Sequence, residues 1–181
     1  HGLLSRRLQL LKDLVPDARR VGILMNPYTV PRNDVEKGVE EERRQLGLAI
    51  IVFEARGPED FDATLAAMAR DRLDGVLILA DATFYLHRMR LGEWCSKQRL
   101  PSIWGGSGYL DGGGLASFQG DYAELFRRSA SQVDKILKGT PPGEIAWEQS
   151  TKFELVLNMK AARALGLTVP QSVRVSADEV I

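Results

Sequence analysis

The chain has 181 residues, a length that favours one substantial domain with a continuous core over two domains. Its 24 lysines and arginines balance 24 aspartates and glutamates, so no net charge attracts nucleic acid or an anionic membrane surface. The sequence contains no run of about 18 apolar residues that would span a bilayer, and its single cysteine has no partner for an internal disulfide.

Helical and strand patterns alternate from the N-terminus onwards. Leucines 4, 8 and 11 and Val15 recur at helical spacing and predict an opening helix that Pro16 ends. The next segment, 21–25, is apolar throughout, which is typical of a strand buried on both faces of a parallel sheet. We then expect a helix over about 33–46, a strand over 49–53, a helix containing Phe61, Leu65 and Met68, a strand over 76–80, a helix over about 84–98 and a short strand over 102–104.

This alternation predicts an α/β fold with a doubly wound, flavodoxin-like parallel sheet. Towards the C-terminus the pattern predicts a strand over 153–157 and a helix over 159–165, which ends at Gly166 in a left-handed C-cap. The tail over 169–181 has mixed character, and we expect it to lie along the surface.

In doubly wound sheets ligands bind beyond the carboxyl ends of the strands. One such loop begins Asn26-Pro27-Tyr28, and it is either a simple turn into a helix or a source of side chains and helix amides for a ligand carboxylate. A second loop contains Asp81 and Thr83, which are either an N-cap pair or, for Asp81, an anionic oxygen for a ligand ammonium.

A third loop, from Trp104 to Tyr109, contains three glycines between two aromatic residues. Glycines such as Gly105 let the backbone approach a ligand that a ring covers, although ordinary turn chemistry explains them equally well. We expect Phe84, Trp104 and Tyr109 near the rim of the site, with Ser107 inside it.

The sequence offers little to catalysis. The loop after the first strand lacks the spaced glycines of a dinucleotide fingerprint, and Gly105-Gly-Ser-Gly-Tyr109 lacks the last glycine of a nucleophile elbow. We interpret His87 as a solvated histidine on a helix, and Cys95 as a core thiol that shares a helical face with Leu91 and Trp94.

Metal binding has no support in the sequence either. No pair of histidines or cysteines has ligand spacing, and arginines follow directly after the acidic run 40–42, which is typical of a solvated helix face. We therefore expect no catalytic residue, no metal and no cofactor.

The last third of the chain carries the most specific pattern. Gln119-Gly-Asp121-Tyr122 enters a long helix that closes Ile136-Leu-Lys-Gly139, and a segment 153–158 reading Phe-Glu-Leu-Val-Leu-Asn leads into a helix before Leu165-Gly-Leu-Thr-Val-Pro170. Together with Asn26-Pro27 and segments 10–16 and 56–61, this pattern resembles the substrate-binding proteins of ABC transporters, in particular the TrpX-like proteins. The resemblance covers nearly the whole chain and implies a type I periplasmic-binding-protein fold.

The resemblance implies that residues 1–181 form a single C-terminal lobe, and we expect a first lobe before His1. It also implies a solute-binding component of an ABC import system, periplasmic or membrane-anchored outside the cytoplasm, with an ABC permease as partner. The ligand would be a small organic molecule, with an amino acid favoured. Asp81 would meet its ammonium, and Asn26, Thr83 and Ser107 its carboxylate or amide, while Gln119 would lie near the hinge.

Two other classes of function remain open at this point. The same fold serves as a ligand-sensing domain of receptors and transcriptional regulators, and nothing in the sequence separates that role from transport. An enzyme on a flavodoxin-like sheet would need an acid–base group that the sequence does not offer.

The helix over 121–138 is strongly amphipathic. We expect Asp121 to cap it, and Phe126, Ala130, Val133 and Leu137 repeat at intervals of four, three and four residues. By resemblance this helix packs on the first lobe. In its absence the apolar face folds onto this lobe or a second copy covers it, and we predict self-association through it.

Overall fold

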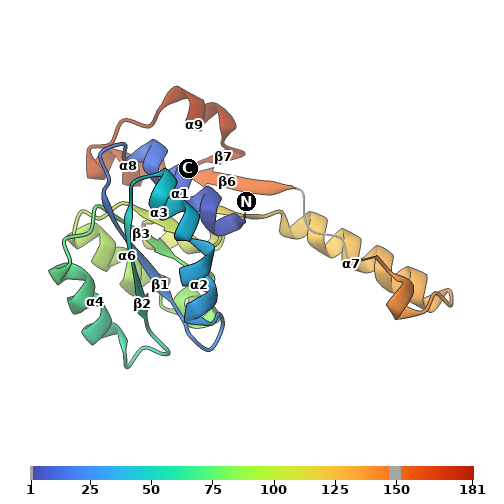
Figure 1. Ribbon diagram of the computed structural model, residues 1–181. Helices are drawn as coiled ribbons and strands as arrows, with labels where there is room; N and C mark the ends of the chain where they lie inside the picture. The colour runs from blue at the N-terminus through green and yellow to red at the C-terminus, as the bar shows by residue number, and fades with distance from the viewer. Residues whose placement is uncertain (1, 147–151) are drawn as a thin grey trace.

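The computed structural model describes residues 2–146 and 152–181, which form a central sheet flanked by helices (Figure 1). In these residues the sheet has seven strands in the order β2-β1-β3-β4-β5-β6-β7. The strands are β1 (Arg20–Met25), β2 (Ala49–Glu54), β3 (Gly75–Ile78), β4 (Ser102–Trp104), β5 (Ala116–Gly120), β6 (Phe153–Leu157) and β7 (Glu179–Val180). All neighbours are parallel except β5 and β6. The predicted fold class is confirmed, with one antiparallel pair within the sheet.

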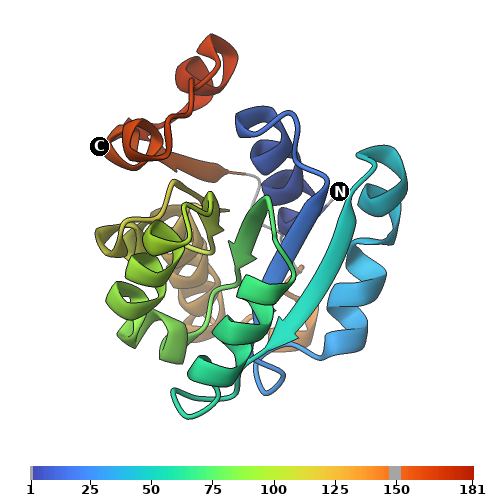
Figure 2. The ribbon, with the colours of Figure 1, turned by 90° about the vertical axis from the view of Figure 1, so that its left-hand side faces the viewer.

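Helices cover both faces of the sheet (Figure 2). One layer contains α1 (Leu3–Leu14), α2 (Arg32–Gly38), α3 (Glu40–Gln45), α8 (Met159–Leu165) and α9 (Gln171–Ser176). The other contains α4 (Phe61–Arg70), α5 (Ala82–Leu86), α6 (Arg88–Lys97) and the 3-10 helix η1 (Ser107–Gly112). Successive strand residues point to opposite faces, so Ile23 packs in one core and Leu24 in the other. This two-sided burial explains the continuous apolar strands.

Two helices that the sequence pattern predicts as continuous are each divided in the structure. The helix expected over 33–46 breaks between α2 and α3 at Val39, and the helix expected over 84–98 breaks between α5 and α6 at His87. Val39 is fully buried, and the His87 ring contacts Phe61 edge-on, with 5.4 Å between ring centres. Packing against the core therefore outweighs the helical pattern at both points. The interpretation of His87 as a solvated residue within a helix is wrong, because its ring is half-buried at a break.

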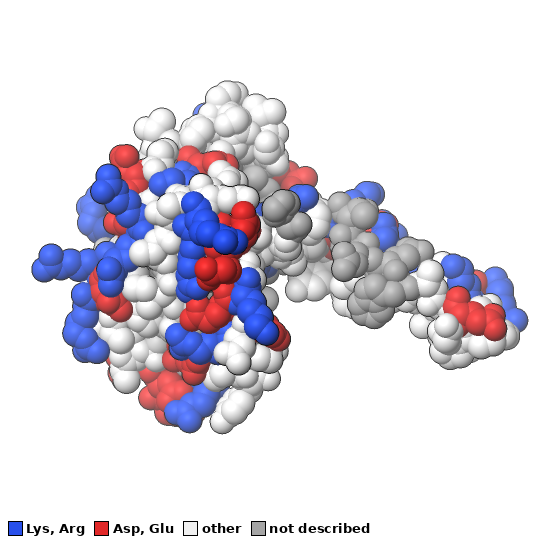
Figure 3. All heavy atoms as spheres, in the orientation of Figure 1, with Lys and Arg blue, Asp and Glu red and all other residues white. Residues whose placement is uncertain are grey.

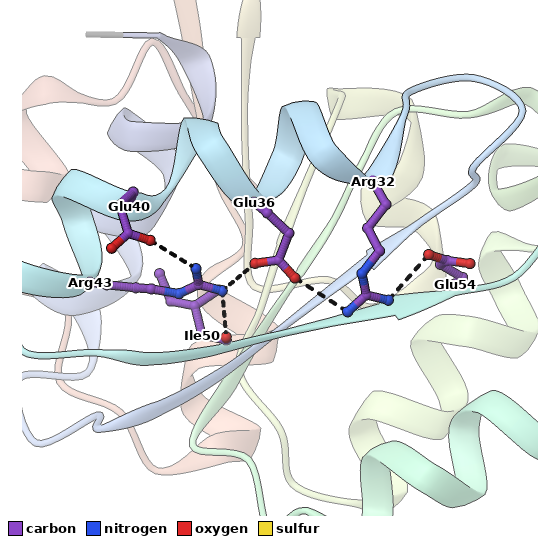
Figure 4. A network of polar contacts seen from close by, with 6 residues as sticks. All are labelled: Arg32, Glu36, Glu40, Arg43, Ile50 and Glu54. Atoms are coloured by element: carbon purple, nitrogen blue, oxygen red, sulfur yellow. Dashed lines mark hydrogen bonds and ion pairs between the residues drawn. The ribbon is translucent and has the colours of Figure 1, made fainter.

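Charges of both signs cover the outer surface of α2 and α3 (Figure 3). The Arg43 guanidinium bonds Glu36, Glu40 (3.2 Å) and the Ile50 carbonyl (3.0 Å), while Arg32 bonds Glu36 and Glu54, both at 3.2 Å (Figure 4).

The acidic run 40–42 at the start of α3 is only partly solvated. Glu40 and Glu41 are exposed as expected, but the expectation is wrong for Glu42, which is 6% exposed. Glu42 faces α1 across a small cavity that Ser5 and Gln9 also line.

The helix α7 (Tyr122–Leu137) leaves the end of β5 and extends away from the body, followed by the short 3-10 helix η2 (Pro142–Glu144) (Figure 1). It buries none of its residues, and Phe126 and Leu137 are 70% and 82% exposed. The alternative in which this helix folds onto the lobe is therefore wrong. We call residues 122–146 the arm, and residues 2–121 and 152–181 the body. Within residues 2–146 and 152–181, no helix is both long and apolar enough to cross a bilayer.

The chain returns from the arm into β6, which pairs antiparallel with β5. Helix α8 then ends at Gly166, whose φ of 74° confirms the predicted left-handed C-cap. The tail forms α9 and β7, and β7 adds the last strand of the sheet beside β6. Because the returning strand is antiparallel, it brings its N-terminal residues next to the C-terminal end of β5.

Candidate functional site

The order of the strands locates the candidate site. Strand β1 pairs with β2 on one side and with β3 on the other, so the direction in which the sheet grows reverses between β1 and β3. Ligands of doubly wound sheets bind in the crevice that this reversal opens at the carboxyl ends of the strands. We call this side of the sheet the carboxyl edge.

Asp81 organises the loops after β1 and β3. Its Oδ1 accepts from the backbone amides of Thr83 (2.8 Å) and Phe84 (3.2 Å), and its Oδ2 accepts from Asn26 Nδ2 (3.1 Å) and Thr29 Oγ1 (2.5 Å). The N-cap interpretation of Asp81 is confirmed. Four donors fill the acceptor positions of a carboxylate, so a ligand ammonium would have to displace one of them.

Asn26 is a second buried member of this group. Its Oδ1 accepts from the Tyr28 amide at 3.0 Å, and its Nδ2 donates to the Arg56 carbonyl at 3.3 Å. The turn interpretation of Asn26-Pro27-Tyr28 is therefore confirmed, and the amide of Asn26 points inward. The Tyr28 side chain, in the loop after β1, is 80% exposed.

The predicted aromatic rim is wrong for Phe84 and Trp104. Both side chains are fully buried, since Phe84 packs against Phe61 and Trp104 against Tyr109 in the core under η1. The indole of Trp104 donates to Ser102 Oγ at 2.8 Å, across one strand repeat on the same face of β4. These rings support the loops and do not face a ligand.

Tyr109 and Gly105 hold the ends of β3 and β4 together. The Tyr109 hydroxyl accepts from the Asp81 amide (3.0 Å) and donates to the Asp81 carbonyl (2.9 Å). A Cβ on Gly105 would lie 2.4 Å from the Ala80 amide nitrogen, so this glycine permits close packing of two backbones. Gly105 therefore lets the loop after β4 pack closely against the loop after β3.

A second polar group lies at the ends of β4, β5 and β6. Gln119 on β5 is 7% exposed, and its Nε2 donates to Ser107 Oγ (3.2 Å) and to Glu154 Oε2 (2.5 Å). Glu154 is the register partner of Gln119 on β6. Sequence reasoning missed Glu154, because it does not reveal that β6 returns antiparallel beside β5.

Arg7 is the other residue of this group that sequence reasoning missed. It occupies a buried position of α1, between Leu4 and Leu8, and is 7% exposed. Its Nε donates to the Phe118 carbonyl (2.7 Å) and its Nη2 to the Gly105 carbonyl (3.2 Å). Burial lowers the pKa of its guanidinium from the ordinary value. The available signal was an arginine inside an apolar helical stripe.

Asp121 lies where the arm leaves the sheet. Its Oδ1 accepts from the Glu124 amide at 2.9 Å, which confirms the predicted cap of α7. Within residues 2–146 and 152–181, this cap is the side-chain hydrogen bond that Asp121 forms.

The described residues offer no metal centre, since residues 2–146 and 152–181 contain no group of three or more histidine, cysteine or acidic side chains placed to hold an ion. Cys95 is buried in the core as predicted, and burial raises the pKa of its thiol to about 12. A thiol in that state is a poor nucleophile.

A cavity of about 320 Å³ lies between α1 and α9, where Arg6, Gln9, Phe118 and Val173 line it. None of the residues that line it belongs to the loops after β1 and β3.

Polar groups that gather at the carboxyl edge of a doubly wound sheet are typical of an α/β ligand-binding domain. The chain belongs to the family of ABC transporter substrate binding proteins, because the sequence model of that family matches residues 1–181. The predicted resemblance is confirmed.

Similar proteins agree with this assignment. A tyrosine-binding protein of Clostridioides difficile (strain R20291) is 18% identical over 177 residues, which cover 98% of this chain and 50% of that protein. A domain from Streptococcus pneumoniae, solved in complex with L-Trp, has a TM-score of 0.89 at 22% identity and covers all of this chain and 61% of its own. A conserved domain protein from Vibrio cholerae has a TM-score of 0.88 at 22% identity, covering 98% and 60%. The chain thus spans between half and two thirds of the length of these relatives.

Proposed function

We propose that this chain is a ligand-binding lobe of a solute-binding protein that serves an ABC importer. The observation that carries the proposal is the convergence of Arg7, Ser107, Gln119 and Glu154 beside the Asp81 network at the carboxyl edge. Side chains from separate elements converge in this way where a lobe presents polar groups to a small molecule. The Asp81 network holds the loops, and the second group faces the ligand.

The proposed ligand is an amino acid, and the protein binds it without covalent chemistry. One relative is a tyrosine-binding protein and another was solved with L-Trp, which supports this class of ligand. Closure of a second lobe over the ligand would shift the population of the protein towards a closed state that a permease recognises.

The arm supports the proposal of a second lobe. The relatives are longer than this chain, and the apolar face of α7 has no cover within the described residues. We propose that α7 packs on that lobe, and that residues 1–181 alone associate through the same face. Sedimentation of the isolated chain should show association that rises with concentration, and Phe126→Asp should abolish it. A monomer at every concentration contradicts the self-association.

Calorimetric titration of the protein expressed from its complete gene with each standard amino acid tests the ligand class. We expect saturable binding of at least one of them, at one ligand per chain, and its recovery unchanged by mass spectrometry after prolonged incubation. Failure to bind any amino acid contradicts the proposed ligand class, and chemical conversion of the ligand contradicts a purely binding role. Fractionation of the source cells tests the proposed location outside the cytoplasm.

A further inference from the structure

Arg7 carries a charge that the described part of the chain does not balance. Among residues 2–146 and 152–181, no carboxylate forms an ion pair with it, although its side chain is more than nine-tenths buried. Removing a charge from water is unfavourable unless a partner offsets the loss of hydration. An apolar residue at this position would complete the buried stripe of α1 without that cost.

The two bonds that Arg7 makes account for only part of its guanidinium. A guanidinium has five N–H groups, and the Phe118 and Gly105 carbonyls accept from two of them. Nη1 has no hydrogen-bond partner in the described residues, and it is not among the side-chain nitrogens that are fully sealed from solvent without one. Nη1 is therefore not fully sealed from solvent, and its N–H groups are available to a further acceptor.

The two carbonyls that accept from Arg7 locate its guanidinium near the candidate site. Strands β4 and β5 pair only up to Trp104 and Ser117, and beyond that point they diverge. The guanidinium lies in the divergence, between the carbonyls of the residues that follow, Gly105 and Phe118. It therefore approaches the carboxyl edge from α1, next to Ser107 and Gln119.

We propose that Arg7 is the anion-binding group of the site and takes the carboxylate of an amino acid ligand on the free side of its guanidinium. This inference rests on the proposed function and names the residue that binds the negative charge of the ligand. The planar fork of arginine matches a carboxylate with two parallel hydrogen bonds.

Glu154 favours a carboxylate over a phosphate as the anion. It is the neighbour of Gln119 in the sheet, and within the described residues no ion pair joins it to Arg7. A carboxylate at this edge repels a dianion but tolerates, or attracts through its ammonium, a zwitterion. The position of Glu154 therefore predicts a ligand orientation opposite to the one expected from the sequence. The ligand ammonium would point towards β6 and away from Asp81.

The test compares acids with their amides, using L-tryptophan against L-tryptophanamide and L-tyrosine against L-tyrosinamide. We titrate them into the protein expressed from its complete gene, as wild type, Arg7→Met and Arg7→Lys. The unmodified protein should prefer the acid by roughly tenfold or more, because a hydrogen bond to a charged group carries that much affinity. Arg7→Met should lose the preference by weakening the acid alone, and Arg7→Lys, which keeps the charge without the fork, should reduce it.

Arg6→Met is the matched control, since it removes the same charge one residue away on the exposed side of α1. It should leave the preference for the acid unchanged. If Arg7→Met weakens acid and amide equally, or if it retains the preference, Arg7 only holds the two strands apart and the inference is overturned. Should Arg7→Met not fold, Arg7→Lys with an unchanged preference overturns it. Competition by inorganic phosphate stronger than by acetate assigns the site to phosphate instead.

The outcomes separate the two proposals. A wild-type protein that binds the amino acids but ignores the difference between acid and amide overturns this inference and leaves the proposed function standing. A wild-type protein that binds neither overturns both.

Discussion

Helices α1 and α7 carry the same apolar spacing, and they end in opposite environments. Leu4, Leu8 and Leu11 of α1 and its C-cap residue Val15 recur at four, three and four residues, and so do Phe126, Ala130, Val133 and Leu137 of α7. Leu8 and Leu11 are fully buried, whereas Phe126 and Leu137 are largely exposed. An amphipathic pattern thus identifies a face that favours burial, but it does not identify what buries it.

The two helices are held by different interactions. Packing against the sheet stabilises α1, as it does most helices of globular proteins. Helix α7 has instead the Asp121 cap and ion pairs one turn apart, such as Glu124 with Arg128 (3.0 Å) and Asp134 with Lys138 (2.8 Å). Surface pairs of this kind contribute little each, so the arm adds little to the free energy of unfolding of the body.

The largest expected difference between body and arm comes from truncating one apolar side chain in each. Leu11→Ala should lower the free energy of unfolding by about 2–5 kcal/mol, because it leaves a cavity between α1 and the sheet. Phe126→Ala should change it by less than about 0.5 kcal/mol at low protein concentration. Urea unfolding followed by circular dichroism measures both.

Equal losses of unfolding free energy in Leu11→Ala and Phe126→Ala contradict this contrast between α1 and α7. They require that the apolar face of α7 is covered even in the isolated chain. Repeating the titration at high protein concentration extends the test. If Phe126→Ala lowers the free energy of unfolding only at high protein concentration, a second copy of the chain covers the apolar face of α7.

Glycine-to-alanine changes give the next largest contrast. A Cβ on Gly92 in α6 would lie 1.9 Å from the Gly112 carbonyl oxygen, so α6 and η1 would have to separate. Gly92→Ala should cost about 1–3 kcal/mol, even though alanine favours a helix by roughly 1 kcal/mol. Gly143→Ala in the arm meets nothing within 4 Å and should leave the urea midpoint unchanged. If Gly92→Ala leaves the free energy of unfolding unchanged, η1 moves away from α6 without loss of stability.

Much of the body follows from the sequence, because its patterns are local. The α1 stripe, the continuous strand 21–25 and the Gly166 cap each depend on a few neighbouring residues. The site depends on which strands lie side by side. Glu154 and Gln119 are 35 residues apart and meet through antiparallel pairing that no local pattern encodes.

The errors at the site have a common physical reason. Trp104 and Phe84 stand next to loops in the sequence, yet their rings point into the core, because strand alternation and helix direction set the side that a ring faces. The apolar spacing of α1 does not reveal Arg7, because the positions that define the stripe, residues 4, 8, 11 and 15, do not include it. A charged residue in an apolar stripe is itself a signal, since its burial needs a reason.

Capping residues provide a smaller contrast. Asp81→Ala removes the oxygen that accepts from two backbone amides of α5, together with the bonds to Asn26 and Thr29. It should therefore lower the free energy of unfolding by at least the roughly 0.5–2 kcal/mol of a single cap. Asp121→Ala should reduce helicity at 222 nm and leave the urea midpoint of the body unchanged. A shift of that midpoint by Asp121→Ala equal to that of Asp81→Ala would show that body and arm unfold as one unit.

The smallest expected effect is a dependence on pH that is confined to the body. The hydrogen bond from Arg43 is the main cause that lowers the pKa of Glu36 below its ordinary value of 4.5, and Arg128 lowers that of Glu124 in the same way. A lowered carboxyl pKa stabilises the folded state above the ordinary pKa, and this contribution is lost as the pH falls through the folded value. Glu36→Gln should therefore be less stable than wild type at pH 7, by up to about 1 kcal/mol, and the gap should close below about pH 4.5.

Glu124→Gln is the matched change in the arm, and it should follow the wild-type urea midpoint at every pH, because unfolding of the body does not break its ion pairs with Arg127 and Arg128. Urea midpoints collected from pH 3 to pH 7 for the wild type, Glu36→Gln and Glu124→Gln measure how far the stability of each variant falls below that of the wild type. A gap for Glu36→Gln that persists at pH 3 would mean that the loss comes from packing and not from charge. A gap for Glu124→Gln that closes on acidification would couple the arm to the body and remove the distinction between them.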